Sequence, residues 1–305
     1  MPSRRILPFL SLLLLLALSL SSCVVKRRLI VRQGAGKSQP VLQVASASEL
    51  LQKISDQYNA IGNFTMTVDM TPALGTAEKS RITEYKDVRA YILFRKPDEI
   101  RLIGLYPVVR NTAFDMVSVG DQFKLYLPAR NEFVEGSNTM TGEPSKNKLT
   151  NLRPQHFLDA LLVRPLAAQD KVFLENFTDE ENAWYILHEV RENRAGVLDL
   201  VRTVWFNRID LQIARQMIFD PGGNILTDAR YSNWAAFNGA RFPKHIEIDR
   251  PRDEYAVVMD IVKMDINQGV SDDKFVLNQP AGSTLRVLGQ ASPAASQTAK
   301  DGHAQ

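Results

Sequence analysis

The feature that most constrains the fold is a succession of short apolar runs between residues 89 and 136, separated by breaks that are too short to hold a helix. The breaks consist of residues that favour turns, such as Lys96-Pro97-Asp98, Val119-Gly120-Asp121 and Pro128-Ala129-Arg130-Asn131. Strands joined by such short connections pair in antiparallel. The stretch therefore predicts a meander with strands at 90–94, 100–105, 112–118, 123–127 and 132–134.

The first 22 residues predict an export signal rather than part of a fold. Arg4 and Arg5 precede an apolar core from Ile6 to Leu20, and Leu20-Ser21-Ser22 stands directly before Cys23, which is the chain's single cysteine. Leu-Ser-Ser-Cys resembles the bacterial lipobox, in which the peptidase cuts before the cysteine and the cysteine is acylated. The apolar core is shorter than the roughly 18 residues of a spanning helix. The alternatives are an uncleaved transmembrane anchor and an ordinary secretory signal.

The rest of the sequence predicts one folded domain. The chain has 305 residues, of which 45% are apolar, and this is enough for one large core. Removing Arg4 and Arg5 from the net charge of +3 leaves about +1, so the charge does not favour a nucleic-acid partner. We expect a lipidated tether over 23–45, a domain over 46–288 and a disordered tail over 289–305.

Two helices are predicted from apolar periodicity and from their end signals. The first runs from Ser48, with Ser46 or Ser48 as its cap, to about Ile61. The second begins at Pro154, which suits a first turn, and ends before Pro165. Both helices have one apolar side, so we expect both to cover a sheet.

Further strands are predicted on either side of the meander. Phe64, Met66, Val68 and Met70 alternate with polar residues, which is typical of a half-buried strand. The second half of the chain adds runs at 183–190, 198–206, 209–219, 225–234, 242–248 and 255–266. The predicted fold class is therefore mainly β with helices (α+β): a single curved antiparallel sheet of about twelve strands with two or three covering helices.

A sheet of this size with one apolar face curls around that face, and either helices or an apolar ligand fill the hollow. In the run 209–219, Ile209 and Leu211 continue the apolar face, and Arg215 interrupts it. The candidates for lining a lipid cavity are Phe64, Met66, Val68, Met70, Ile213, Met217 and Phe219. The same residues can equally pack a core that holds no ligand.

The order of these features resembles the LolA/LolB superfamily of lipoprotein-localisation factors. The match runs from the first helix and strand, through the turn at Arg95-Lys96-Pro97 and the segment Phe123-Lys124-Leu125-Tyr126-Leu127-Pro128, to a closing F-x-L-x-x-P-x-G from Phe275 to Gly282. The resemblance implies an open half-barrel with a helical lid that binds acyl chains. It also implies that Arg95 and Lys96 contact the lid, although the family's arginine has Lys96 in its place here.

The resemblance further suggests a membrane-contact loop after the third strand. The turn formed by Leu105, Tyr106, Pro107, Val108 and Val109 is unusually apolar for an exposed hairpin. The alternative is that this turn folds under the lid and is buried.

We therefore expect a lipid-anchored cell-envelope protein on the outer membrane, facing the periplasm, because Val24 stands where an aspartate would retain a lipoprotein at the inner membrane. It would bind acyl chains of a lipoprotein or another amphiphile and pass them to membrane lipid, with a periplasmic carrier protein as a candidate partner. The sequence predicts no cofactor, metal site or catalysis, since its histidines stand far apart and catalytic motifs are absent. The alternative function is a regulatory or structural lipoprotein that uses the same fold as a sensor or scaffold.

Overall fold

The computed structural model describes residues 41–76, 81–84, 87–139, 153–179 and 182–288. One compact unit comprises Leu42–Phe177 and Ala183–Gln305, and it contains the sheet and both helices. A second unit comprises Met1–Val41 and Thr178–Asn182, and most of it lies outside the described residues. The predicted signal, most of the tether and the predicted tail also lie outside them.

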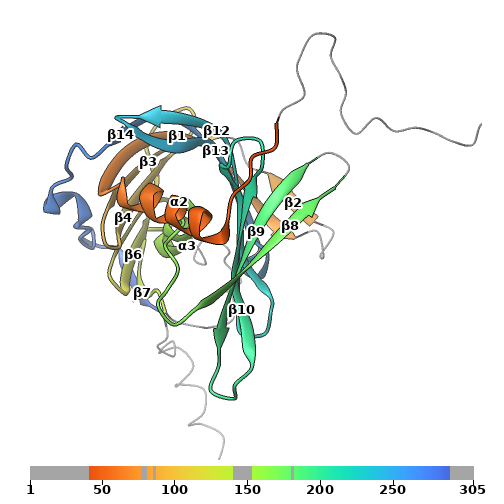
Figure 1. Cartoon of the computed structure of the whole chain (residues 1–305). Helices are drawn as coiled ribbons and strands as arrows, with labels where there is room; N and C mark the ends of the chain where they lie inside the picture. Colours follow the sequence, from red (N-terminus) through yellow and green to blue (C-terminus); the bar gives the residue numbers. More distant parts are fainter. Residues whose placement is uncertain (1–40, 77–80, 85–86, 140–152, 180–181, 289–305) are drawn as a thin grey trace, which may run out of the picture. The chain divides into compact units, whose positions relative to one another are not determined.

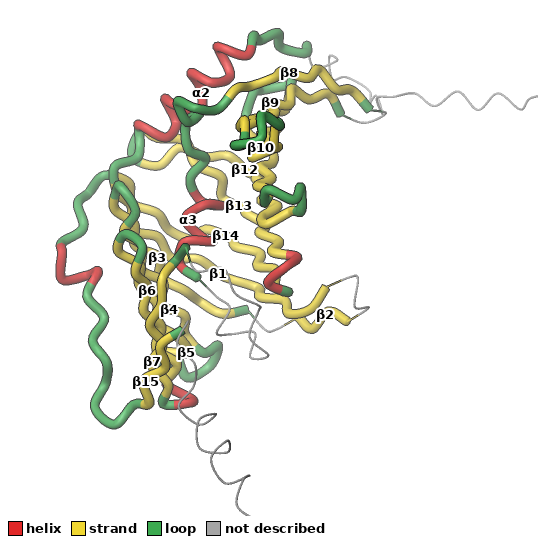
Figure 2. Tube along the Cα trace, turned by 90° about the horizontal axis from the view of Figure 1, so that it is seen from below, coloured by secondary structure: helices red, strands yellow, loops and turns green. Residues whose placement is uncertain are grey.

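The described strands form one open sheet of fifteen strands (Figures 1 and 2). In the first half of the chain they are β1 (Asn63–Thr76), β2 (Arg81–Glu84), β3 (Val88–Arg95), β4 (Glu99–Leu105), β5 (Thr112–Val119), β6 (Gln122–Leu127) and β7 (Glu132–Ser137). In the second half they are β8 (Lys171–Thr178), β9 (Ala183–Glu192), β10 (Leu198–Asn207), β11 (Ile213–Phe219), β12 (Ile225–Phe237), β13 (Ala240–Arg250), β14 (Tyr255–Ile266) and β15 (Thr284–Val287).

The strand order shows how the two halves of the chain join. The order is β15-β7-β6-β5-β4-β3-β1-β14-β13-β12-β11-β10-β9-β8, and β2 pairs beside β1. The two halves meet where β1 pairs with β14, in a ladder that runs from Phe64 opposite Ile266 to Leu74 opposite Tyr255. The meander from β3 to β7 is antiparallel, as predicted, whereas β15 adds to β7 in parallel. The edge strands β15 and β8 do not pair with each other, so the sheet is an open half-barrel.

The sequence prediction of about twelve strands is too low, because β2, β8 and β15 are missing from it. The predicted strand 209–219 also begins too early, since β11 starts at Ile213. Residues 208–212 form a turn instead. The side chain of Asn207 accepts from the amide of Ile209 at 2.9 Å, and Leu211 has a positive φ of 54° that no strand allows.

Two helices lie on the concave side of the sheet (Figures 1 and 2). α2 (Ala47–Asn59) begins at Ser46, whose side chain accepts from the amide of Glu49, while the Glu49 carboxylate accepts from the amide of Ser46 at 2.7 Å. This capping box selects Ser46 rather than Ser48 as the cap. α3 (Pro154–Leu161) begins with the predicted proline at its first position.

A smaller apolar cluster lies on the opposite, convex face of the meander. It combines Val117 and Phe133 with Phe275 and Leu277 from the segment that leads to β15. Arg101 donates from Nη1 to the carbonyl oxygens of Lys274, at 2.9 Å, and Val276, at 3.3 Å, and holds this segment in place. The closing F-x-L motif thus covers the outside of the half-barrel.

Candidate functional site

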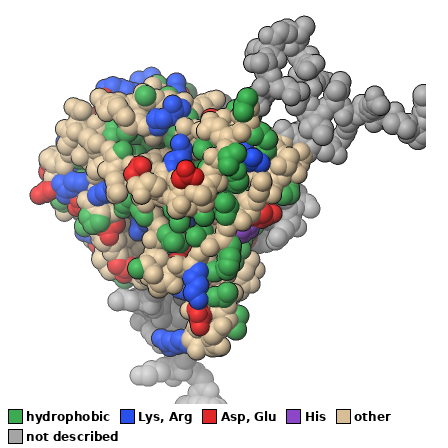
Figure 3. Space-filling view, in the orientation of Figure 1, with side chains coloured by type: hydrophobic (Ala, Val, Ile, Leu, Met, Phe, Trp, Pro, Cys, Tyr) green, Lys and Arg blue, Asp and Glu red, His purple; other side chains and the backbone are tan. Residues whose placement is uncertain are grey.

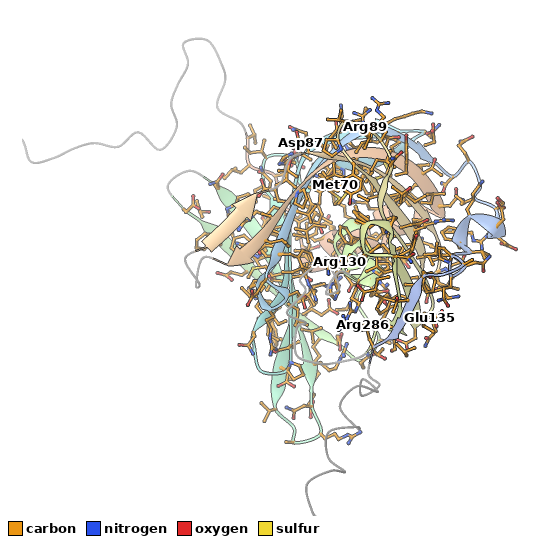
Figure 4. The ribbon with its side chains drawn as sticks, turned by 180° about the vertical axis from the view of Figure 1, so that it is seen from behind. Met70, Asp87, Arg89, Arg130, Glu135 and Arg286 are labelled. Atoms are coloured by element: carbon orange, nitrogen blue, oxygen red, sulfur yellow. The ribbon has the colours of Figure 1, made fainter. Side chains whose placement is uncertain are left out.

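The concave face of the sheet is apolar along its central strands. Phe64, Met66, Val68 and Met70 of β1 all point to this side and are buried, and the ring centroid of Phe64 lies 5.1 Å from that of Phe94. Polar residues of the same strand face outwards: the Asp69 carboxylate pairs with Arg89 at 2.8 Å, and Figure 4 shows Arg89 at the rim with Met70 beneath it. The alternation predicted for this strand is confirmed.

The face assignment predicted for β11 needs a correction. Phe206 pairs with Ile213, but the next pair is Trp205 with Arg215, so Ala214 is an extra residue in a β-bulge. The bulge reverses the alternation after Ile213. As a result the Gln216 side chain reaches α3 on the concave side, while Met217 and Phe219 lie on the convex face. The strand therefore contributes Ile213 and Gln216 to the interior.

α3 fills the hollow of the half-barrel. Its apolar side chains Phe157, Leu158 and Leu161, and Leu162 directly after it, are all buried and belong to the same core cluster as the concave face. A hollow between α2, α3 and the sheet, lined by Tyr58, Leu161 and Phe242 among others, has a volume of about 10 Å³, which is just enough for one water molecule. Two larger hollows are open to the surface: one of about 520 Å³ lies beside the polar side of α2, and one of about 420 Å³ lies on the convex face.

Polar side chains of the sheet hold the C-terminal end of α3. Tyr231 Oη donates to the carbonyl oxygen of Ala160 at 2.7 Å, and Gln216 Nε2 donates to that of Asp159 at 2.8 Å. Arg202 donates to the carbonyl oxygen of Arg164 at 2.7 Å, while it pairs with the buried Glu189. Tyr231 and Gln216 satisfy carbonyl groups that a helix end leaves without a partner, and Arg202 fixes the segment just after α3. α3 is therefore seated by a few directed hydrogen bonds in addition to apolar contact.

A second polar cluster holds the N-terminal end of α3 through His156. Arg250 donates to His156 Nε2 at 2.9 Å, so this nitrogen is an acceptor, and Nδ1 donates its proton to Tyr255 Oη at 2.8 Å. Burial, together with the charges of Arg250 and Arg153, lowers the pKa of His156 well below its usual value. Burial also raises the pKa of Tyr255. The cluster is thus neutral at the histidine and carries its charge on Arg250, which is paired with Asp253.

These inward polar residues are not predictable from composition, because arginine and glutamine usually lie on the surface. A signal was nevertheless present for Arg202. It stands two residues before Val204 and four before Phe206, in phase with the buried face of β10.

The two predicted lid contacts have different partners. Lys96 Nζ donates to the carbonyl oxygen of Tyr58 at 2.6 Å and lies 3.8 Å from the centroid of that ring, so it contacts the end of α2. Arg95 instead pairs with Glu99 and, at 2.6 Å, with Asp272, and its guanidinium lies over the ring of Phe275. Arg95 therefore binds the segment on the convex face rather than a helix of the lid.

The turn between β4 and β5 is exposed, not folded under a helix. Val108 is 91% exposed, Val109 is 65% exposed and Tyr106 is 40% exposed, whereas Leu105 is half-buried at the end of β4. Cys23 lies outside the described residues. None of the helices in the described part of the chain has both the length and the hydropathy to cross a membrane. Within the same residues, no group of three or more His, Cys, Asp or Glu side chains is placed to hold a metal ion.

The fold is similar to several solved structures. A DUF1329 family protein from Desulfovibrio piger matches with a TM-score of 0.51 and 15% identity over 75% of this chain and 95% of its own. A domain from Vibrio parahaemolyticus named for outer membrane lipoprotein sorting matches with a TM-score of 0.50 and 11% identity over 74% of this chain and 94% of its own. A LolA superfamily protein from Nitrosomonas europaea has a TM-score of 0.49 and 15% identity over 77% and 99% of the two chains.

The matches to the Desulfovibrio piger and Vibrio parahaemolyticus proteins confirm the predicted half-barrel at the level of the fold alone. At such low identities they say nothing about ligand or partner. Comparison of the sequence with protein-family models finds no match, and comparison with curated proteins finds none either.

Proposed function

We propose that this chain binds the acyl chains of a lipoprotein, or another amphiphile, in the hollow of its half-barrel, and that α3 leaves its seat when the guest enters. One observation carries the proposal. The concave face is apolar across the neighbouring strands β6, β5, β4, β3, β1 and β14. The helix that fills its hollow has only eight residues. The apolar side chains of α3 therefore act as a plug: they cover an apolar surface that an acyl chain could cover in their place.

The exchange of α3 for a guest is close to balanced in free energy. Burial of a leucine or phenylalanine side chain contributes about 2 kcal/mol, so the four apolar side chains of the plug contribute about 8 kcal/mol. Burial of one methylene contributes about 0.8 kcal/mol, so about ten methylenes of an acyl chain offset the loss of the plug. Binding would then be reversible, as a carrier or receptor needs, and it would require no covalent chemistry.

The donors that seat α3 would be available to the polar part of the guest. Tyr231 and Gln216 bind carbonyl oxygens in the last turn of α3, and Arg202 binds the carbonyl oxygen of Arg164 just after it. An acyl ester or amide carries the same kind of acceptor, and buried donors without partners are costly. We infer that these three side chains orient an amphiphile with its acyl chain along the apolar sheet.

Anchoring would place the domain at a membrane. We propose that Cys23 is acylated after cleavage and that the protein lies on the outer membrane and faces the periplasm. Membrane lipid, and a periplasmic carrier that delivers the guest, are its proposed partners. Cys23→Ala should prevent both acylation and cleavage, because both act at that residue. Metabolic palmitate labelling that persisted in the variant would contradict the anchor.

The filled interior favours a second candidate function. A hollow of about 10 Å³ holds no guest, as expected for a non-catalytic regulatory or structural lipoprotein that uses the fold as a sensor or scaffold. The two functions differ in what happens when α3 is loosened. In a carrier, weaker packing of α3 against the sheet eases entry of the acyl chain. In a scaffold, the same weakening only lowers the free energy of unfolding.

A fluorescent fatty-acid titration of three variants separates these functions. Leu161→Ala weakens the plug, so it should tighten binding by about tenfold, because a larger fraction of molecules has the helix displaced. Met66→Trp narrows the hollow and should weaken binding. Val276→Trp, at an exposed position on the convex face, is the matched control and should leave binding unchanged.

Denaturant melts of the same variants complete the experiment. Leu161→Ala should lower the free energy of unfolding by about 2 to 5 kcal/mol. If that loss occurs and no variant binds the fatty acid, the protein is a scaffold and the carrier function is wrong.

A further inference from the structure

β8 is an open edge of the sheet with apolar side chains on both of its faces. It is the last strand in the sheet order, and β9 is its one neighbour among the described strands. Phe173 is 55% exposed, and Leu174 and Phe177 are exposed as well. Figure 3 shows hydrophobic side chains along the side of the molecule formed by β8 and β9. Exposed edges of this kind pair readily with another strand.

The contacts of β8 show which residues share a face. Phe177 packs against Trp205 with ring centroids 6.2 Å apart, and Glu175 contacts His188 at 2.7 Å, so these two residues lie on the convex face. Asn176 accepts from Arg208 Nη1 at 2.8 Å on the concave side. Lys171, Phe173, Glu175 and Phe177 therefore line the convex face, and Val172, Leu174 and Asn176 the concave face.

We propose that two copies of this chain pair through β8, antiparallel, with the two-fold axis at Phe173. In this register Lys171 of each copy lies opposite Glu175 of the other, Phe173 lies opposite Phe173, and Val172 lies opposite Leu174. Opposite charges thus meet on one face, and apolar side chains meet on both. The pairing is isologous, so the same strand serves as both partners and each copy covers the exposed edge of the other.

The alternative two-fold registers match poorly. A two-fold axis perpendicular to the sheet keeps each face on its own side, so residues that lie opposite each other must belong to the same face. The axis therefore lies between the two β8 strands, level with a residue that faces its own copy. Centred at Val172, the pairing places Lys171 against Phe173; centred at Leu174, it places Phe173 against Glu175. Centred at Glu175, it places two like charges together, which is unfavourable. The register at Phe173 alone combines charge and apolar complementarity.

Single cysteines test the register directly. In the full chain carrying Cys23→Ser, a cysteine introduced by Phe173→Cys is the only one. At the axis, opposed Cβ atoms lie about 5 Å apart, so a short bis-maleimide should link two copies. Phe177→Cys is the matched control, because its two copies lie roughly 26 Å apart along the strands. Cross-linking at 177 as strong as at 173, or none at either position, would overturn the proposal.

Charge reversal gives a second measurement, with sedimentation velocity of the full chain in detergent as the readout. Lys171→Glu and Glu175→Lys each place like charges together at two points and should weaken the dimer by about tenfold. The double reversal restores both pairs and should recover the original dissociation constant. Within its own copy Lys171 pairs with Glu192 at 3.2 Å and Glu175 contacts His188 at 2.7 Å, but both side chains are exposed, so thermal melts should change little. A double variant that remains as weak as the single ones would refute this register.

Discussion

His156 lies between two partners that fix its protonation state. Arg250 donates to one ring nitrogen and Tyr255 accepts from the other, so the ring is neutral and both partners are satisfied. A proton added to Nε2 would point at a guanidinium in a buried site. The lowered pKa of His156 follows first from burial and then from the neighbouring arginines.

This protonation state predicts a dependence of stability on pH. Because the pKa of His156 is lower in the folded state, the unfolded chain takes up the proton first as the pH falls. The contribution of the neutral ring is fully present above about pH 6.5 and is lost below it, at up to about 1.4 kcal/mol per pH unit. The free-energy gap between the wild type and His156→Asn in urea melts should therefore shrink from pH 7.5 to pH 5.5.

His245→Asn is the control for this measurement. Hydrogen bonding to Asp260 raises the pKa of His245, so its contribution is present below about pH 6.5 and is lost as the pH rises through the raised value. The difference in the free energy of unfolding between the wild type and His245→Asn should therefore grow as the pH falls. If the difference in the free energy of unfolding between the wild type and His156→Asn stays constant with pH, His156 is not held neutral.

At the scale of residues, the sequence predicts what depends on local pattern. The inward positions of Phe64 to Met70 follow from alternation, and Ser46 was one of two expected caps. Gln216 could not be placed, because the bulge at Ala214 depends on how β10 and β11 pair. The sequence of one strand does not indicate where its pairing with a neighbour shifts by one residue.

At the scale of elements, strands with clear turn signals are predictable and short or exposed strands are not. The meander strands β3 to β7 agree with the predicted runs to within about three residues, since proline and glycine mark the breaks. β8 has no alternating pattern, because both of its faces are exposed at the edge. β2 and β15 have four residues each, so they depend on their neighbours.

The exposed turn after β4 carries a prediction about membrane contact. Val108→Glu combined with Val109→Glu places two carboxylates at the tip, which opposes entry into an apolar phase. Both positions are exposed, so the melting temperature and fatty-acid binding should stay unchanged. Transfer of a bound fluorescent lipid to vesicles should fall by about tenfold or more.

Val276→Glu, at an exposed position on the convex face, is the matched control for charge and should transfer normally. Transfer by the turn variant at the wild-type rate would show that the turn does not contact the membrane.

At the scale of the whole molecule, the half-barrel is predictable and its filling is not. Many strands with one apolar face must curl, and the order of the motifs indicates the family of folds. Whether the hollow is empty depends on the summed volumes of many side chains and on the seat of α3. The polar contacts of that seat come from β10, β11, β12, β13 and β14, which lie far from α3 in the sequence.

The central claim is that α3 gives way to a guest, and hydrogen exchange of the backbone amides tests it most directly. Exchange followed by mass spectrometry, with and without a saturating fatty acid, reports on α3 and on the sheet in one experiment. We predict that peptides covering Pro154–Leu161 exchange faster when the fatty acid is bound, while those covering β1 and β3 exchange no faster. Bound fatty acid with unchanged or greater protection of α3 would contradict the account.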